Sequence, residues 1–398
     1  MNVPKLRFKE FTDKWQKVPL NLFTNIYGGY AFKSENLLNY KAKYQVIKMG
    51  NVNNNTLNLE KNPSYLNTIS QKELPYLLEK NDIILTLTGT FGKKDFGYSY
   101  QIKNETNLLL NQRLAVFKIT NSNYSANFLK YILLNNTFLN KFFRFSVGGT
   151  GNQANVSIQD IKSFKIPFPK LEEQNKIANF LTTVDKKITN LENTIISLEN
   201  QKKGLLQQIF SQKLRFKDEN GNNYPNWEKK KLEDIAIFLD NKRKPLEQSE
   251  RIHGKYPYYG ASGIIDYIND YIFDEELVLL SEDGANIIDR NYPICYIATG
   301  KYWVNNHAHV LKVKSQYVNK FICESLEQLN YTKYNTGTAQ PKLNQDVCRK
   351  IILSIPCLEE QTKIANFLST FDRKLENQKA QLEHWKQIKK GLLQQMFV

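Results

Sequence analysis

The sequence contains Leu171-Glu-Glu-Gln-Asn-Lys-Ile-Ala-Asn-Phe-Leu181 and, 187 residues later, Leu358-Glu-Glu-Gln-Thr-Lys-Ile-Ala-Asn-Phe-Leu368. At the same spacing, Lys202-Lys-Gly-Leu-Leu-Gln-Gln-Ile-Phe210 returns as Lys389-Lys-Gly-Leu-Leu-Gln-Gln-Met-Phe397. A basic opening also repeats, since Lys5-Leu-Arg-Phe-Lys9 precedes Trp15 and Lys213-Leu-Arg-Phe-Lys217 precedes Trp227. Two copies that align over such a length predict a pseudo-two-fold molecule, which holds two similar domains at a fixed distance.

The repeated stretches open two long helices whose apolar residues recur in alternating steps of four and three. This period is typical of a coiled coil, and each helix is the obvious partner of the other, which predicts an antiparallel pair. Each helix of about 40 residues would be roughly 60 Å long. The seam is interrupted by Lys202, Lys389 and Gln378, which are expected to fix the register. The predicted seam residues are Ile177, Leu181, Val184, Ile188, Leu191, Ile195, Leu198, Leu205, Ile364, Leu368, Phe371, Leu375, Leu382, Trp385 and Leu392.

Gly204 and Gly391 lie inside the two helical patterns. Each glycine costs about 1 kcal/mol relative to alanine in a helix. We interpret them as points where another helix approaches closely; the alternative is that each helix ends there.

The segments between the basic openings and the helices resemble each other more faintly. Residues 82–89 and 276–284 each read as a buried strand that runs into a glycine turn, and residues 111–119 and 305–313 read as a further strand. An amphipathic helix follows, with Phe128 or Phe321. The predicted fold class is therefore α+β, with one mixed α/β domain used twice. The predicted boundaries are 1–168 for the first domain, 169–212 for the first helix, 213–355 for the second domain and 356–398 for the second helix.

Composition narrows the possible functions. The chain has 398 residues, with 41% hydrophobic and 12% aromatic residues, as in a folded globular protein. Its formal net charge is +16 and its pI is about 9.3, which favours a polyanionic partner such as DNA or RNA, although AT-rich codon usage also raises lysine content. The absence of a long apolar run or a signal-peptide core predicts a cytoplasmic protein with no membrane contact. Its four cysteines form no C-x-x-C pair, which argues against a disulfide framework or a zinc site.

No convincing active site or metal site is present in the sequence. Asn62-Pro-Ser-Tyr65 is similar to the Asn-Pro-Pro-Tyr loop of adenine methyltransferases, but Ser64 replaces a proline and no glycine-rich cofactor loop precedes it. There is no phosphate-binding loop of the G-x-x-x-x-G-K-[ST] type. His307-Ala-His309 would place two imidazole rings on one face of a strand, yet no third metal ligand is evident. We therefore expect no catalytic residue, bound cofactor or metal in this chain.

Candidate DNA contacts are better represented. Residues 86–94 combine hydroxyls, backbone donors and two lysines in one predicted loop. Asn241-Lys-Arg-Lys244 is a second basic run or merely a solvated loop, and residues 256–263 offer aromatic rings that either stack on DNA or pack in a strand core. Positions that differ between the copies, such as Arg113 opposite His307, are candidates for reading different bases. The full candidate set is Thr88, Thr90, Lys93, Lys94, Arg113, Thr150, Asn152, Gln153, Lys242, Arg243, Lys244, Tyr259, Lys301, His307, Gln340 and Lys342.

The arrangement resembles the specificity subunit of type I restriction–modification enzymes over essentially the whole chain. The resemblance rests on the Pro-x-Leu-x-Glu-Gln-type entries at residues 169–174 and 356–361, the Ile-Ala-x-Phe-Leu helices, the Gly-Leu-Leu-Gln-Gln repeats and the Gly-Thr loops. It implies a non-catalytic subunit whose two target recognition domains each read one part of a bipartite, asymmetric DNA site, with the helices setting the gap. It further implies two modification subunits that use S-adenosylmethionine and two restriction subunits that use ATP and Mg²⁺.

Two other functions remain open at this point. The chain could be a coiled-coil scaffold that binds other proteins, in which case its function would be insensitive to salt. It could also be a specificity subunit of another restriction class. A fused restriction–methylation enzyme is disfavoured, because its cofactor loop and nuclease carboxylates are not found.

Overall fold

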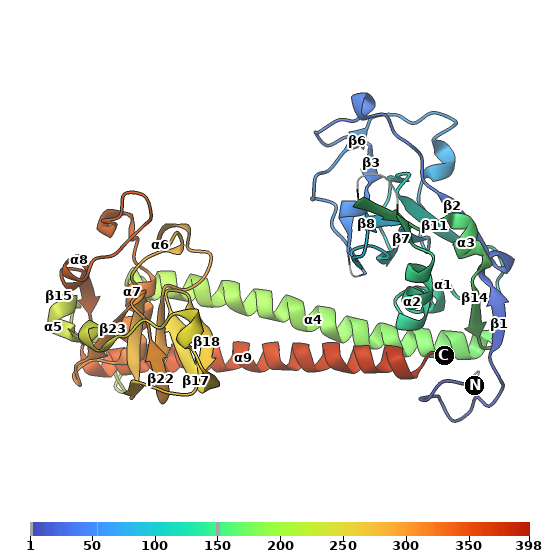
Figure 1. Cartoon of the computed structure of the whole chain (residues 1–398). Helices are drawn as coiled ribbons and strands as arrows, with labels where there is room; N and C mark the ends of the chain where they lie inside the picture. Colours follow the sequence, from blue (N-terminus) through green and yellow to red (C-terminus); the bar gives the residue numbers. More distant parts are fainter. Residues whose placement is uncertain (1–2, 54, 149–151) are drawn as a thin grey trace. The chain divides into compact units, whose positions relative to one another are not determined.

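The structure is a computed structural model that describes residues 3–53, 55–148 and 152–398. It divides into two compact units, of which the first comprises residues 1–191 with 381–398 and the second comprises residues 192–380. Two long helices, α4 (Leu171–Phe210) and α9 (Leu358–Gln395), each contribute one end to each unit (Figure 1). The fold is α+β with two similar domains and two long helices, as predicted.

The two units share the topology of their main antiparallel sheet. The strand order is β2-β11-β7-β9 in the first unit and β16-β23-β20-β21 in the second. The strands of the first sheet are β2 (Thr24–Gly28), β7 (Ile83–Thr86), β9 (Ser99–Gln101) and β11 (Leu114–Ile119). Those of the second are β16 (Ala236–Phe238), β20 (Leu277–Ser281), β21 (Cys295–Ala298) and β23 (Ala308–Val313). The internal repeat therefore extends from sequence to topology.

Other elements are also shared. An antiparallel pair precedes each long helix: β1 (Gln16–Pro19) with β14 (Lys165–Phe168), and β15 (Glu228–Lys231) with β24 (Ile352–Ile355). The predicted amphipathic helices are α1 (Ala126–Leu133) and α7 (Asn319–Glu327). The smaller helices are α2 (Asn136–Arg144), α3 (Ile158–Ser163), α5 (Leu232–Ile235), α6 (Asn286–Asp289) and α8 (Gln345–Arg349).

The units differ in the strands that surround the main sheet. The first adds the sheets β10-β3-β6 and β12-β13-β8 and the pair β4-β5, whereas the second adds one sheet, β18-β17-β22-β19. In the first unit these strands are β3 (Tyr44–Ile47), β4 (Val52–Asn53), β5 (Thr56–Leu57), β6 (Tyr65–Leu66), β8 (Thr88–Thr90), β10 (Leu108–Leu110), β12 (Val147–Gly148) and β13 (Gln153–Asn155). In the second they are β17 (His253–Gly260), β18 (Gly263–Ile268), β19 (Phe273–Asp274) and β22 (Lys301–Val304).

Both faces of each main sheet are buried. In β7, Ile83 and Leu85 belong to the core that contains the start of α4, whereas Ile84 belongs to a second core on the opposite face. In β20, Leu280 faces the α4 and α9 residues of the second unit, and Leu279 faces away from them. Successive side chains point to opposite faces of a strand, so burial on both faces requires the continuous apolar runs seen in the sequence.

The repeated basic openings are anchors for the long helices. Arg7 Nε and Nη2 donate to the buried carboxylate of Glu173, at 2.7 and 2.8 Å, and Trp15 Nε1 donates to the same carboxylate at 3.2 Å. The second unit repeats this arrangement with Arg215, Trp227 and Glu360. Each opening is thereby fixed to the first turn of α4 or α9.

Each basic opening also forms an equivalent backbone hydrogen bond with the end of a long helix. The Leu214 N–H donates to the Gln208 carbonyl near the end of α4, and the Leu6 N–H donates to the Gln395 carbonyl at the end of α9. Gln208 and Gln395 are themselves related by the 187-residue offset. The last turn of one long helix therefore meets a basic opening in both units.

The two long helices pack antiparallel in the second unit, as the ion pairs between them show. Glu199 pairs with Lys379 at 2.7 Å, and Lys202 pairs with Asp372 at 2.6 Å. The step from the first pair to the second goes forward by three residues in α4 and backward by seven residues in α9. In the first unit Lys389 pairs with Asp185 at 2.7 Å. This pair corresponds to Lys202–Asp372, because both of its residues are related to that pair by the 187-residue offset. The seam lysines therefore have specific carboxylate partners.

The predicted seam residues are buried to different degrees. Nine of them are buried: Ile177, Leu181, Val184, Leu191, Ile195, Leu198, Ile364, Leu368 and Leu375. The others are partly exposed: Ile188, Leu205, Phe371, Leu382, Trp385 and Leu392. Near the end of α4, Leu206 is buried instead of Leu205. In the described part of the chain, no helix is long and apolar enough to cross a membrane.

Our interpretation of the helical glycines is wrong. A Cβ atom added to Gly204 or Gly391 would have no described atom within 4 Å, so neither glycine allows a close approach of another helix within this chain. The alternative is wrong as well, because α4 continues to Phe210 and α9 to Gln395. The structure offers no packing reason for either glycine.

Candidate nucleic-acid interface

The candidate residues gather at one end of each main sheet, where three loops meet. In the first unit the Leu87 N–H donates to the Arg113 carbonyl at 3.0 Å, and in the second the Glu282 N–H donates to the His307 carbonyl at 2.9 Å. A third loop joins through the Val156 N–H, which donates to the Leu87 carbonyl. Its counterpart is the Leu343 N–H, which donates to the Glu282 carbonyl. We call this end of each sheet the interface edge.

These backbone contacts show that several predicted residues occupy equivalent positions in the two units. Arg113 and His307 occupy matching places at the start of β11 and β23, and both are exposed. Gln153 and Gln340 each lie three residues before the matching Val156 and Leu343, and both are also exposed. Thr150, the other candidate in the first of these loops, lies outside the described residues. The two edges therefore present different side chains from equivalent backbone positions.

The first interface edge comprises residues 87–98, 111–113 and 152–156. β13 pairs with β8, so that Gln153 lies opposite Thr90 and Asn155 opposite Thr88. Five predicted residues are exposed here: Lys93, Lys94, Arg113, Asn152 and Gln153. These cations and amides are the groups expected to contact phosphates and base edges.

The two threonines of this edge have internal partners. Thr90 Oγ1 donates to Asp95 at 2.6 Å, and Thr88 Oγ1 donates to Asn155 Oδ1 at 3.2 Å. The hydrogen bonds from Thr90 lower the pKa of Asp95, so this carboxylate is negatively charged at neutral pH. Thr88 and Thr90 therefore shape the loop, and the exposed cations around it supply its positive charge.

The second interface edge comprises residues 239–252, 282–294, 305–307 and 335–343. Its exposed predicted residues are Lys242, Lys244, His307, Gln340 and Lys342. Two of them contact carboxylates, since His307 Nδ1 lies 2.8 Å from Asp283 and Lys342 Nζ lies 3.3 Å from Glu282. This edge mixes charges of both signs, as does the first edge, where Asp95 follows Lys93 and Lys94.

Arg243 is not presented to solvent, although its neighbours Lys242 and Lys244 are. Its Nη1 donates to Glu282 at 2.6 Å and to the Ala308 carbonyl at 2.8 Å, and its Nη2 lies 3.4 Å from Asp240. The guanidinium thus ties together three segments beneath the second interface edge. It supports the edge, and its donors are already used.

His309 belongs to the same cluster and is almost completely buried. Its Nδ1 lies 2.6 Å from Asp240 Oδ2, and its Nε2 lies 2.7 Å from the Leu343 carbonyl. Both partners are acceptors, so both ring nitrogens carry protons. Burial would lower the pKa of His309, but the hydrogen bond to the Asp240 carboxylate outweighs it and raises the pKa to about 10.

The ring of His309 and the carboxylates of Asp240 and Glu282 offer three ligand atoms within 4.8 Å of one another. A metal ion would need an unprotonated nitrogen, and both nitrogens of His309 donate hydrogen bonds. Arg243 and His309 already balance the two carboxylates. The predicted pairing of His307 and His309 on one strand face is also wrong, because β23 begins only at Ala308, with His307 exposed and His309 buried.

We expect the charge on His309 to make the second unit less stable at high pH. Its imidazole has a pKa of about 10 when folded and about 6.5 when unfolded, so the folded state binds an extra proton between these values. The contribution is complete below about pH 6.5 and is lost as the pH rises toward 10. Between pH 7 and pH 9 the loss should be about 2 kcal/mol. Urea unfolding of the wild type and a His309→Gln variant measures it, and equal pH slopes would contradict the prediction.

Two predicted residues are not among the exposed residues of the interface edges, although the Tyr259 carbonyl accepts a hydrogen bond from the Asn305 N–H at 3.0 Å. The ring of Tyr259 stacks on Tyr296, with 5.7 Å between centroids, and packs edge-on against Tyr302, so it takes the core-packing role of the two that we considered. Lys301 is the first residue of β22, where its Nζ lies 4.6 Å from the ring centroid of Tyr271. The other end of that strand, Val304, contacts Lys244. Lys301 is therefore at the far end of β22 from the edge.

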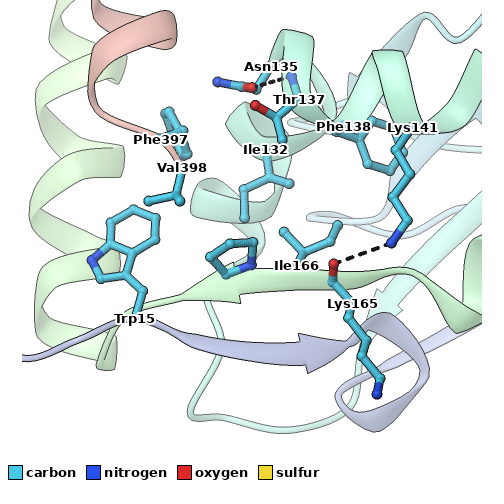
Figure 2. Close-up of a pocket in the computed structure, with 11 residues that line it drawn as sticks. Trp15, Ile132, Asn135, Thr137, Phe138, Lys141, Lys165, Ile166, Phe397 and Val398 are labelled. Atoms are coloured by element: carbon cyan, nitrogen blue, oxygen red, sulfur yellow. Dashed lines mark hydrogen bonds between the residues drawn. The ribbon is translucent and has the colours of Figure 1, made fainter. Parts of the chain in front are cut away.

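A pocket in the first unit shares no residue with the candidate set (Figure 2). Trp15, Phe138, Ile166 and Phe397 give it an apolar lining, and Lys141 donates to the backbone carbonyl of Lys165 at its rim. Its lining comes from Trp15, the helices α1 and α2, the strand β14 and residues 397–398. Nothing in this arrangement suggests nucleic-acid chemistry.

Sequence reasoning missed the acidic residues of the interface edges and one aromatic residue. Asp95, Glu282 and Asp283 could not be assigned, because their partners are distant in sequence or their roles depend on the turn. Phe91 was also missed. The signal in the sequence was an aromatic residue between Thr90 and Gly92 in a predicted surface loop, and the structure shows that it is exposed.

A family model described as "Type I restriction modification DNA specificity domain" matches residues 12–200 and 224–384. A type I restriction enzyme specificity subunit of Methanocaldococcus jannaschii, MjaVIII, is 26% identical over 358 residues, which cover 82% of this chain and 80% of the relative. A putative specificity subunit of Haemophilus influenzae, S.HindORF215P, is 38% identical over 139 residues. That match spans only 35% of this chain and 36% of the relative.

Solved structures show the same fold. The S subunit of a type I restriction–modification system from M. genitalium aligns with a TM-score of 0.66 at 18% identity, covering 100% of this chain and 99% of that one. A chain from a study of the assembly and conformational transition of the type I R-M system aligns with a TM-score of 0.55 at 14% identity, covering 95% of this chain and 96% of that one. The similarity therefore extends over both units.

Proposed function

This chain belongs to the family of type I restriction–modification DNA specificity domains, and on that basis we propose that it is the subunit that selects the DNA sequence. Each of its two target recognition domains reads one half of a bipartite, asymmetric site. The two long helices set the number of unread base pairs between the halves. The chain directs adenine methylation and restriction, which its partner subunits carry out.

The observation that carries this proposal is the pair of equivalent interface edges with different side chains. Backbone hydrogen bonds place Arg113 where the other unit has His307, and both residues are exposed. Arginine pairs well with guanine in the major groove, whereas histidine does not offer the same two parallel donors. Two domains that share a backbone arrangement but present different side chains select two different half-sites. The combined site is therefore not a palindrome.

The charge of the chain supports a DNA partner. Exposed lysines lie at both edges, including Lys93 and Lys94 in the first unit and Lys242, Lys244 and Lys342 in the second. With a net charge of +16, the chain should bind DNA with a strong dependence on salt, because phosphate contacts release counterions. A protein scaffold of the same shape would not need this dependence.

The chemistry belongs to the partners in this proposal. Two modification subunits bind S-adenosylmethionine and methylate adenine, and two restriction subunits use ATP and Mg²⁺ for translocation and cleavage. This chain contributes binding and orientation and is itself non-catalytic. The complex acts in the cytoplasm, where the chromosomal DNA is. The existence of partner subunits is supported by a structural relative that comes from a study of complex assembly in the type I R-M system.

Methylation mapping tests the proposal. The chain is expressed with its modification subunit in a host with low background methylation, and adenine methylation is read across the genome with and without this chain. We expect a bipartite adenine motif that appears only when the chain is present. Exchange of residues 1–165 for the equivalent part of another specificity subunit should alter one half of the motif and leave the other unchanged.

The result also decides between this function and the scaffold alternative. If the modification subunit is expressed and bound but no motif depends on this chain, the sequence-reading function is wrong. Binding that is unchanged between low and high salt would then favour a protein-interaction scaffold.

A further inference from the structure

Phe91 occupies a fixed position at the tip of the first interface edge. The Lys93 N–H donates to the Thr90 carbonyl at 3.0 Å, which closes a turn with Phe91 and Gly92 at its centre. Gly92 has a φ of +76°, as the third residue of a type II turn requires. The Thr90 N–H and hydroxyl both donate to Asp95, at 2.8 and 2.6 Å, and the Phe91 N–H donates to the Asn152 carbonyl at 3.0 Å. The backbone on both sides of Phe91 is therefore held.

The aromatic ring of Phe91 is presented to solvent. Phe91 is 57% exposed, and the Cδ2–Cε2 edge of its ring lies against Gly148 of β12, where an added Cβ would be 3.1 Å from both carbons. Val147, the preceding residue of β12, is also exposed. Single exposed apolar residues are common and need no explanation. This ring differs because a hydrogen-bonded turn orients it.

The charges around the ring identify the kind of partner. Lys93 and Lys94 follow directly in the chain and are exposed, and Arg113 lies exposed in the adjacent loop. These cations would bind the phosphates on the two sides of a base step and bring the ring to the bases. Proteins that kink DNA insert phenylalanine, leucine or isoleucine between base pairs in this manner.

The second unit has apolar residues in the equivalent loop. The connection between β20 and β21, which corresponds to that between β7 and β9, exposes Ile288 and Tyr292. The two loops share no sequence pattern and differ in length and structure. Both loops nevertheless expose bulky apolar residues, and this is a second, separate observation in favour of an apolar contact at the interface edge.

We propose that Phe91 is a wedge that inserts into the base stack of duplex DNA at the half-site read by the first domain. The inference rests on the proposed function, since it assigns the contact that one recognition domain makes. The ring stacks on a base, and the lysines of the turn hold the flanking phosphates. The wedge would favour base steps that unstack easily, so Phe91 contributes to sequence selection without a hydrogen bond to a base.

The test uses the complex of this chain with its modification subunit and a duplex that contains the mapped site. 2-Aminopurine, whose fluorescence rises when it is unstacked, replaces one base at a time in the first half-site, leaving out the methylated adenine. The wild-type complex should show a rise at one step. Phe91→Ala should remove that rise and weaken binding roughly tenfold, as expected for loss of one stacked base, whereas Phe91→Trp should retain both.

Leu22→Ala is the matched control. Leu22 is 62% exposed and precedes β2, so it lies at the end of the same sheet opposite the interface edge. Its replacement should change neither fluorescence nor affinity. Equal fluorescence and affinity for Phe91→Ala and the wild type would overturn the wedge while leaving the proposed function intact. A wild-type complex that binds no bipartite site would instead overturn the proposed function.

A protein contact gives a different result. If Phe91→Ala separates the modification subunit from this chain in sedimentation, but the complex assembled at high concentration keeps the fluorescence rise, the ring contacts the partner protein and the wedge is overturned.

Discussion

Replacement of Arg215 by alanine should lower the free energy of unfolding of the second unit by about 3 kcal/mol. The Glu360 carboxylate is fully buried and is held by two hydrogen bonds from Arg215 and one from Trp227. Without the guanidinium, a buried negative charge keeps only the indole N–H. Breaking a buried ion pair costs more than the pair contributes, because the remaining charge is left without compensation. We expect Arg7→Ala to affect the first unit in the same way, through Glu173.

Hydrogen exchange read by mass spectrometry measures this prediction, because it reports the two units separately. In Arg215→Ala, amides of the second unit should exchange faster, while those of the first unit stay protected. Lys374→Ala, which removes an exposed positive charge from α9 within the second unit and away from Glu360, is the control. A double variant with Arg215→Met and Glu360→Leu should recover most of the lost stability, since an apolar pair leaves no buried charge. A loss in Arg215→Ala no larger than in Lys374→Ala would show that the carboxylate does not depend on its partner.

The repeat, the helices and the main strands could be predicted from the sequence because their signals are local. The alternating steps of the seam reflect helix geometry, and the runs at residues 83–85 and 277–280 are apolar because both sheet faces are covered. The equivalence of Arg113 and His307 followed from aligning the copies, and matching backbone hydrogen bonds confirm it. For such features, a pattern that is found in both copies supports the same structural prediction twice.

The roles of individual charged residues could not be predicted, because they depend on partners far away in the sequence. Lys242, Arg243 and Lys244 are indistinguishable as a basic run, yet only Arg243 turns inward, toward Glu282, which is 39 residues away. His309 was predicted to share a strand face with His307, and its buried cluster with Asp240 depends on how three loops meet. The helical glycines were misread for the related reason that a small residue in a helix does not show whether anything packs against it.

Lengthening both long helices by one turn should change the gap in the recognised DNA site and leave the two half-sites unaltered. Four residues add about 6 Å and turn the helix by only about 40° beyond a full turn, so the apolar seam keeps facing its partner. At 3.4 Å per base pair the gap should increase by one or two base pairs. The half-sites should persist because neither interface edge contains residues of α4 or α9. Methylation mapping of the variant measures both effects.

The ion pairs between the helices determine where the residues must be inserted. Asp185 pairs with Lys389 in the first unit and Lys202 pairs with Asp372 in the second, so insertions between residues 185 and 202 and between residues 372 and 389 leave both pairs in register. Four residues inserted in the turn at residues 218–222 lengthen the chain without lengthening a helix, and should leave the gap unchanged. A stable helix variant that methylates sites with the original gap would show that the helices do not set it. The spacing would then have to come from how each domain binds its partner subunit, because the lengthened helices would no longer determine where the half-sites fall.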